Sequence, residues 1–245
     1  MSSTRLTRRA LVRVSATDEA EDPAAFLQGL LTNDVKGELP VYAALLTAQG
    51  KTMFDMIVWR DGADILLDCE AEVAEDLAKR LSLYRLRRKL AIGVEDTLAV
   101  HWQEAPRDGA SLDPRLPALG YRWLAPADET ESGADEAWRA VRLAHGMPEG
   151  ARELGDILWL ETNAVELNGV SFNKGCYIGQ ENTARMNWRQ KVNRRLVVVP
   201  LERSEEKRRK ALHEDLGLAV DHLRVADIPS DLVPSWLDLG ESGEA

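Results

Sequence analysis

Apolar and polar positions in the first hundred residues follow strand and helix periods in turn. Five stretches alternate or run apolar over the length of a strand, and two carry apolar residues at helical spacing. Gly50 separates two of the strands with too little chain for a helix, which favours a hairpin. The expected strands are 10–15, 41–49, 52–60, 63–69 and 97–102, and the expected helices lie within 22–35 and 70–84.

The second half of the chain is less regular. Residues 103–135 are rich in Pro, Gly and Asp, which is typical of a loop-bearing connection that ends in a flexible boundary. We expect a helix over 136–145, a strand over 194–201 and a charged helix or extended arm over 203–218. The tail after Pro229 is expected to be loosely attached. Hairpins mixed among helices favour an α+β fold over a doubly wound parallel sheet.

Asp55 is an acidic residue inside an apolar strand. It shares a strand face with Met53, Ile57 and Trp59, and the opposite face of the same strand is also apolar. A carboxylate inside a buried strand requires a partner. The partner is either an arginine or backbone amides, or the carboxylate serves a ligand as a hydrogen-bond acceptor or base.

Cys176 lies between two glycines in the stretch "FNKGCYIGQENTAR", residues 172–185. Gly175 and Gly179 permit conformations and close approaches that other side chains block. A helix is expected to begin near Gly179, and its N-terminus, together with Lys174, favours a thiolate. The alternative is a small buried thiol with a structural role, and the local pattern leaves both open.

Composition indicates a soluble globular chain. The 245 residues carry a formal net charge of −10, 44% hydrophobic residues and no apolar run of bilayer-spanning length, so we expect neither a membrane segment nor direct nucleic-acid binding. The Arg-rich start is interpreted as a basic lead to the first strand and not as a transit peptide. Two distant cysteines predict a reducing, cytoplasmic setting.

Positive charge is nevertheless concentrated in two places. Residues 174–195 hold six Lys and Arg against Glu181 alone, and residues 84–89 read "YRLRRK". Such runs are either solvated surface or the binding site of a small anion. The two cysteines and four histidines show no metal-ligand spacing, and phosphate- or dinucleotide-binding glycine patterns are absent from the sequence.

"KGCYIGQE", residues 174–181, resembles the hallmark of the YgfZ-type folate-binding proteins, which are related to the glycine-cleavage aminomethyltransferase. The similarity extends to further blocks in the same order over most of residues 5–200. These blocks are "FLQGLLTNDV", "LLTAQGKTMFDMIVW", "LYRLRRK" and "LETNAVELNGVSFNKGCYIGQENTARM".

The resemblance implies a folate-binding region over 1–192 with a central cavity, and a reduced C-terminal β domain over 193–245. It implies tetrahydrofolate or a one-carbon derivative as the ligand, and Cys176 as the functional thiol. Asp55 or Glu161 would accept from the pterin, and the other implied binding residues are Lys174, Tyr177, Gln180, Glu181 and Arg185. The implied partners are iron–sulfur assembly proteins and client 4Fe–4S enzymes, including those that support tRNA modification.

Two departures from the resemblance affect the function. Aminomethyltransferases carry paired acidic residues where this chain has Phe54 and Asp55, which argues against glycine-cleavage chemistry. Residues 203–217 also lack the glycine-rich hairpins of a complete C-terminal barrel. Three functions therefore compete, namely a folate-dependent iron–sulfur maturation factor, a folate-dependent aminomethyl- or methyltransferase, and a folate-binding adaptor with a structural Cys176.

Overall fold

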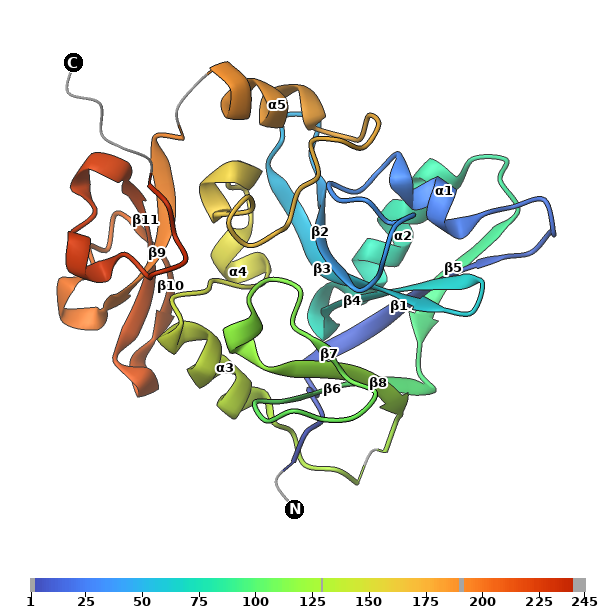
Figure 1. Ribbon diagram of the computed structural model, residues 1–245, viewed down its shortest axis with the longest axis horizontal. Helices are drawn as coiled ribbons and strands as arrows, with labels where there is room; N and C mark the ends of the chain where they lie inside the picture. The colour runs from blue at the N-terminus through green and yellow to red at the C-terminus, as the bar shows by residue number, and fades with distance from the viewer. Residues whose placement is uncertain (1–2, 129, 190–191, 240–245) are drawn as a thin grey trace.

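Three antiparallel sheets, with short helices between and around them, make up the computed structural model, which describes residues 3–128, 130–189 and 192–239 (Figure 1). The first sheet has five strands in the order β2-β3-β4-β1-β5. Its strands are β1 (Arg9–Ala16), β2 (Val41–Leu46), β3 (Thr52–Asp61), β4 (Asp64–Glu70) and β5 (Leu90–Glu95). The expected hairpin between β2 and β3 is confirmed, with Val41 opposite Val58.

Helices α1 (Pro23–Gln28) and α2 (Ala74–Arg85) cover one face of this sheet. Asp22 caps α1 by accepting from the Ala24 amide, and Pro23 occupies the first turn, where its missing N–H is not needed. A 3₁₀ turn, Ala71–Val73, leads into α2. Leu77 and Leu81, one helical turn apart, bury the inner face of α2 against the sheet, as the sequence periodicity predicted.

The second sheet combines the strand expected over 97–102 with two strands from the segment expected to be a loop connection. Its strands are β6 (Leu98–Gln103), β7 (Ser111–Leu112) and β8 (Tyr121–Pro126), in the order β6-β8-β7. The loop interpretation of 103–135 is therefore wrong for 121–126, where six residues pair with β6. The short elements that follow are α3 (Asp135–Ala144), α4 (Ala151–Leu154) and a 3₁₀ turn (Trp159–Thr162).

The third sheet follows α5 (Gln180–Arg189) and has the order β10-β11-β9. Its strands are β9 (Arg194–Pro200), β10 (Arg209–His213) and β11 (Leu218–Arg224). The prediction of a charged helix or arm over 203–218 is wrong, because β10 pairs with β11. The tail is also not loose within the described part, since Leu237 is buried and the Trp236 indole donates to the His145 carbonyl at 2.7 Å.

The α+β prediction is confirmed by this arrangement of hairpin sheets and helices. A large core to which all three sheets contribute contains Trp59, Trp138 and Trp159. In the part of the chain that the structure describes, no helix is long and apolar enough to span a bilayer.

Candidate functional site

Cys176 lies in an exposed loop that its neighbour Lys174 fixes to the C-terminal end of α1. The Lys174 side chain is buried, and its ammonium donates to the backbone carbonyls of Gln28, at 2.6 Å, and Leu31. These acceptors are at the C-terminal end of α1, where the carbonyls are short of partners. Burial lowers the pKa of Lys174 to about 8, opposed by the Asp34 carboxylate. Lys174 therefore anchors the loop, while the Cys176 side chain remains open to solvent.

Gly179 sets the direction in which the loop enters α5. It adopts φ +82°, and a Cβ atom there would lie 2.6 Å from the Thr47 carbonyl in the β2–β3 turn. The same Cβ atom would lie 3.0 Å from the Gly50 Cα, and Asn182 donates to the Gln49 carbonyl at 2.9 Å. The motif helix therefore rests on the hairpin tip. A Cβ atom at Gly175 would meet open space, so the packing there does not require glycine, in contrast to the expectation from the sequence.

The remaining motif residues divide between the interior and the surface. Tyr177 is buried, and its ring lies 5.1 Å from the Lys174 ammonium. Gln180 is half-buried at the start of α5, while Glu181 and Arg185 are exposed on that helix. Arg185 donates to Asn182 at 2.6 Å. The predicted helix start near Gly179 is confirmed, since α5 begins at Gln180.

Asp55 is buried, as the sequence predicted, and its hydrogen-bond partner is the Tyr42 hydroxyl, which donates at 3.2 Å. Burial raises the pKa of Asp55, the positive charge of Arg9 opposes this shift, and the Glu149 carboxylate adds to it. A carboxyl with a raised pKa in a buried setting can accept or hold a proton. Of the protein partners considered from the sequence, an arginine or backbone amides, neither forms this hydrogen bond, because the donor is a tyrosine hydroxyl.

A buried network of arginines and carboxylates surrounds this position, and the sequence reasoning missed it. Arg115 binds Asp113 through two nitrogens, at 2.8 and 2.7 Å, and also pairs with Glu149. Arg122 joins Asp113 to Asp68, and Asp68 accepts from Arg9 at 2.6 Å. Lone charges inside apolar strands, such as Asp68 and Arg122, were the available signal.

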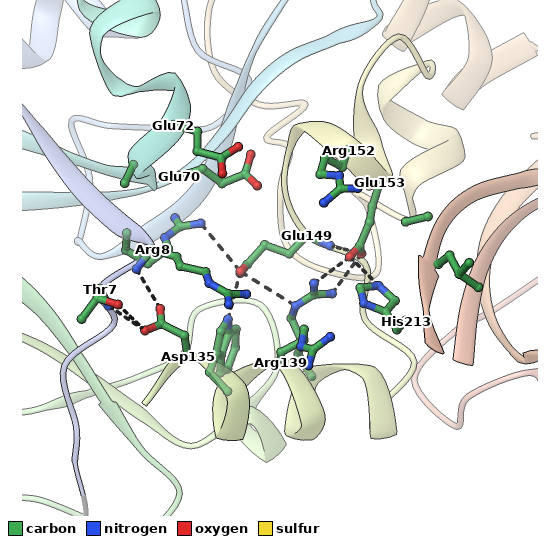
Figure 2. Close-up of a pocket in the computed structure, with 16 residues that line it drawn as sticks. Thr7, Arg8, Glu70, Glu72, Asp135, Arg139, Glu149, Arg152, Glu153 and His213 are labelled. Carbon is green, nitrogen blue, oxygen red and sulfur yellow. Dashed lines mark hydrogen bonds and ion pairs between the residues drawn. The ribbon is translucent and has the colours of Figure 1, made fainter. Parts of the chain in front are cut away.

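A pocket of about 640 Å³ lies beside this network, between the first sheet, α3 and β10 (Figure 2). Five arginines and five carboxylates line it. Glu70 and Glu72 lie on one side, and His213 of β10 lies at another. Burial raises the pKa of Glu70, whose Oε2 accepts from the Ala151 amide at 2.6 Å.

Two arginines at the pocket differ in their exposure and in their pairing. Arg9 is buried, and its Nη1 has no hydrogen-bond partner within residues 3–128, 130–189 and 192–239; the Glu149 carboxylate is 3.7 Å away. Arg152 makes no side-chain ion pair or hydrogen bond with any described residue. Glu149 itself is buried, which would raise its pKa, but Arg115, Arg9, Arg142 and Arg122 together hold that pKa well below its usual range.

Glu161 lies apart from this pocket, at the third sheet. Its carboxylate is 3.0 Å from Nε2 of His222 on β11, and Trp159, two residues earlier, packs on Tyr42 with ring centroids 5.6 Å apart. The predicted site residues thus lie in three places. Asp55 is in the first sheet, Glu161 is at the third sheet, and the rest are in the cysteine loop and α5, namely Lys174, Cys176, Tyr177, Gln180, Glu181 and Arg185. None of the predicted residues lines the described pocket. In the described part of the chain, no cluster of three or more His, Cys, Asp or Glu side chains could hold a metal ion.

The sequence matches no protein-family model. It is 35% identical over 240 residues to the mitochondrial iron–sulfur cluster assembly factor IBA57 of Mus musculus, covering 81% of this chain and 66% of the relative. With the Homo sapiens protein the identity is 36% over 236 residues, covering 80% and 65%. Homologues of this chain are IBA57 iron–sulfur cluster assembly factors. The chain spans slightly less than two thirds of the length of these two relatives.

The fold is that of an aminomethyltransferase. The aminomethyltransferase T of the glycine cleavage system from Bartonella henselae superposes with a TM-score of 0.65, over 92% of this chain and 79% of that chain. The TM-score shows a shared fold, and an identity of 13% shows nothing about activity. The expected aminomethyltransferase-like fold is confirmed.

The cytoplasmic prediction is contradicted by these relatives. The mouse and human IBA57 proteins, and the Neurospora crassa homologue that is 30% identical over 233 residues, are all mitochondrial by name. The prediction rested on the number and spacing of cysteines, which indicate a reducing compartment and do not distinguish among such compartments.

Proposed function

We propose that this chain is a folate-binding, YgfZ-type factor that supports the assembly or repair of 4Fe–4S enzymes through the thiol of Cys176. The observation that carries the proposal is the exposure of Cys176 on a loop that is held rigidly on both sides. Lys174 fixes the loop to α1, and Gly179 fixes the following helix to the β2–β3 turn. A small structural thiol would instead be buried, as Cys69 is. The iron–sulfur role of the homologues supplies the chemistry.

The chemistry of such a thiol is ligand exchange at a cluster iron. Cys176 gives its proton to water, its sulfur forms a bond to one iron of a cluster on an assembly protein, and a cysteine sulfur of that protein leaves the same iron and takes up a proton. No electrons are exchanged. An exposed sulfur is required because the cluster arrives on another protein.

The arginine-lined pocket suits a folate in size and charge. Binding pockets of about 300–1,000 Å³ are usual for small ligands, and this one falls within that range at about 640 Å³. A carboxylate of a folate glutamate suits Arg152, which is exposed at this pocket, and ring N–H donors suit Glu70. Bound tetrahydrofolate would supply a carrier for a one-carbon unit. The roles of Asp55, Glu161 and the other motif residues toward this ligand remain part of the proposal.

Replacing Cys176 by Ala tests the thiol. Cells that depend on the variant should lose most of the activity of their 4Fe–4S enzymes, whereas Cys69→Ala, which removes the buried thiol, should leave those activities near the wild-type level. Full activity with Cys176→Ala would refute a functional thiol and leave a structural role.

Calorimetric titration with tetrahydrofolate tests the ligand. Arg152→Gln should weaken binding by about tenfold, the loss of roughly one charge-assisted hydrogen bond. Arg60→Gln, which changes an exposed arginine on β3, is the matched control. If wild-type protein binds no tetrahydrofolate at about 1 mM, a concentration that detects even affinities of about 4 kcal/mol, the folate part of the proposal fails.

A further inference from the structure

Two strongly exposed leucines lie at the C-terminal end of α2. Leu83, in the last turn of the helix, is 67% exposed, and Leu86, which follows the helix as its C-cap, is 85% exposed. Leu86 has φ 51° and ψ −114°, a backbone conformation that leucine rarely adopts. A glycine would fit this turn more easily, and a polar residue would be better solvated. The fold itself therefore gains nothing from a leucine at this position.

Positive charge surrounds the two leucines. Arg87 and Lys89 are exposed, and neither side chain has an ion-pair or hydrogen-bond partner in the part of the chain that the structure describes. Together with Glu21 and Arg88, Leu86 and Arg87 line an open hollow of about 680 Å³. Arg88 is held in place by Glu21, at 2.7 Å. A cationic, apolar surface on a chain with a net charge of −10 is matched to an acidic apolar partner.

Helix α1 connects this surface to the cysteine loop. The guanidinium of Arg88 lies over the Phe26 ring, 5.5 Å from its centroid, and donates to the Asp22 carbonyl at the start of α1. Lys174 binds the other end of the same helix. A helix of six residues is about 9 Å long. A partner helix of ordinary length can therefore extend from the Arg88 end of α1 to its Lys174 end.

We propose that Leu83, Leu86, Arg87 and Lys89, here called the leucine–arginine patch, dock an acidic amphipathic helix of a partner protein and hold that partner beside Cys176. The leucines receive its apolar face, and Arg87 and Lys89 meet its carboxylates. The identity of the partner, an iron–sulfur assembly protein, rests on the proposed function. The docking of an acidic helix at the leucine–arginine patch does not rest on it.

A defined peptide pair tests the docking. The probe is a fluorescein-labelled helix of about 16 residues with leucines along one face and glutamates along the other, and its isomer carries lysine in place of glutamate. Fluorescence anisotropy should show binding of the acidic peptide at least about tenfold tighter than of the basic one, and the difference should shrink between about 50 mM and 300 mM salt.

Matched variants locate the binding. Leu86→Asp and Arg87→Glu should each weaken binding of the acidic peptide about tenfold or more. Leu112→Asp and Arg60→Glu make the same changes at exposed positions on β7 and β3 and should leave it unaltered. The proposal is overturned if wild-type protein does not bind the acidic peptide, if the two peptides bind equally, or if the controls weaken binding as much as the patch variants.

Two further arms separate the alternatives. Co-sedimentation with anionic phospholipid vesicles that depends on Leu86, without peptide binding, would assign the patch to a membrane surface and overturn a protein partner. Cys176→Ala, which tests the proposed function, should leave peptide affinity unchanged, so the two proposals can fail separately. An acidic peptide with a chloroacetyl end should alkylate Cys176 faster than the basic isomer does, because docking raises its local concentration; equal rates would show that a docked partner does not reach the thiol.

Discussion

The ammonium of Lys174 donates to the carbonyl of Gln28, the last residue of α1, across 146 positions of the sequence. This hydrogen bond holds the loop that carries Cys176 against α1. The charged residue that the sequence analysis assigned to thiolate stabilisation is used to position the loop that carries the thiol.

Lys174 should make stability depend on pH between about 8 and about 10.5. Its pKa is about 8 in the folded chain against 10.5 for a free lysine, so the unfolded chain binds more protons in that window and stability rises with pH. Relative to Lys174→Met, the wild type should gain about 1–3 kcal/mol from pH 7.5 to pH 10.5 in urea unfolding. Parallel curves for the two proteins would contradict a depressed pKa.

Gly179 and Gly175 should respond differently to alanine. Gly179→Ala brings a Cβ within 2.6 Å of the Thr47 carbonyl at a positive φ and should cost more than about 2 kcal/mol of the free energy of unfolding. Gly175→Ala meets open space and should cost less than about 1 kcal/mol. Thermal and urea unfolding of the pair measure this, and equal losses would show that the close contact of α5 with the hairpin is not what requires glycine.

Glu149 should be essential to the buried network. Glu149→Gln removes the carboxylate that Arg115 contacts and leaves that guanidinium buried with less compensation, at a cost of about 3–5 kcal/mol. Glu136→Gln, at an exposed pair with Arg8, should cost less than about 1 kcal/mol. Urea unfolding of both variants provides the comparison, and a small loss in Glu149→Gln would mean that the remaining acids satisfy Arg115.

The gain in stability from Asp55→Asn, relative to wild type, should be largest near neutral pH. Burial raises the pKa of Asp55, so ionisation of the wild-type carboxyl destabilises the folded state as the pH rises through that pKa. The stability of Asp55→Asn relative to wild type should therefore increase between pH 4 and pH 7. The opposite slope in paired unfolding curves would show that the Tyr42 hydroxyl and nearby arginines stabilise the charged form instead.

Leu86→Gly should separate folding from docking. It relieves a positive φ and should raise the free energy of unfolding by up to about 1 kcal/mol. The same change removes the leucine that the acidic peptide contacts, so affinity should fall although the fold is intact. A variant that is both less stable and still binds the peptide would assign Leu86 a structural role.

The sequence predicted four of the five strands of the first sheet, β1 to β4, because they alternate or are continuously apolar, and such patterns follow burial. It predicted no strand at β5. It failed for β8, which is embedded in a segment rich in Pro and Gly, and for β10, an edge strand whose charged residues resemble a surface helix. Local pattern carries no information about an edge strand whose partner supplies the hydrogen bonds.

The sequence was informative where one residue departs from its own surroundings. The burial of Asp55 was predictable because it interrupts an apolar strand, and Cys176 stood out because of its glycines and its resemblance to a known motif. The network of Arg9, Asp68 and Arg122 was not found, because Arg122 and Asp68 are 54 positions apart and only tertiary packing brings them together. The anchoring role of Lys174 was missed for the same reason.

One cysteine is buried and the other is exposed, so the two thiols can be labelled separately in the unmodified protein. Burial raises the pKa of Cys69 to about 12 and closes it to solvent, whereas Cys176 is exposed. A maleimide dye added to folded protein should therefore attach at a single site, on the Cys176 loop, without any engineered cysteine. The second site becomes available only when the first sheet opens, so the slow second labelling step measures how often that sheet unfolds under native conditions.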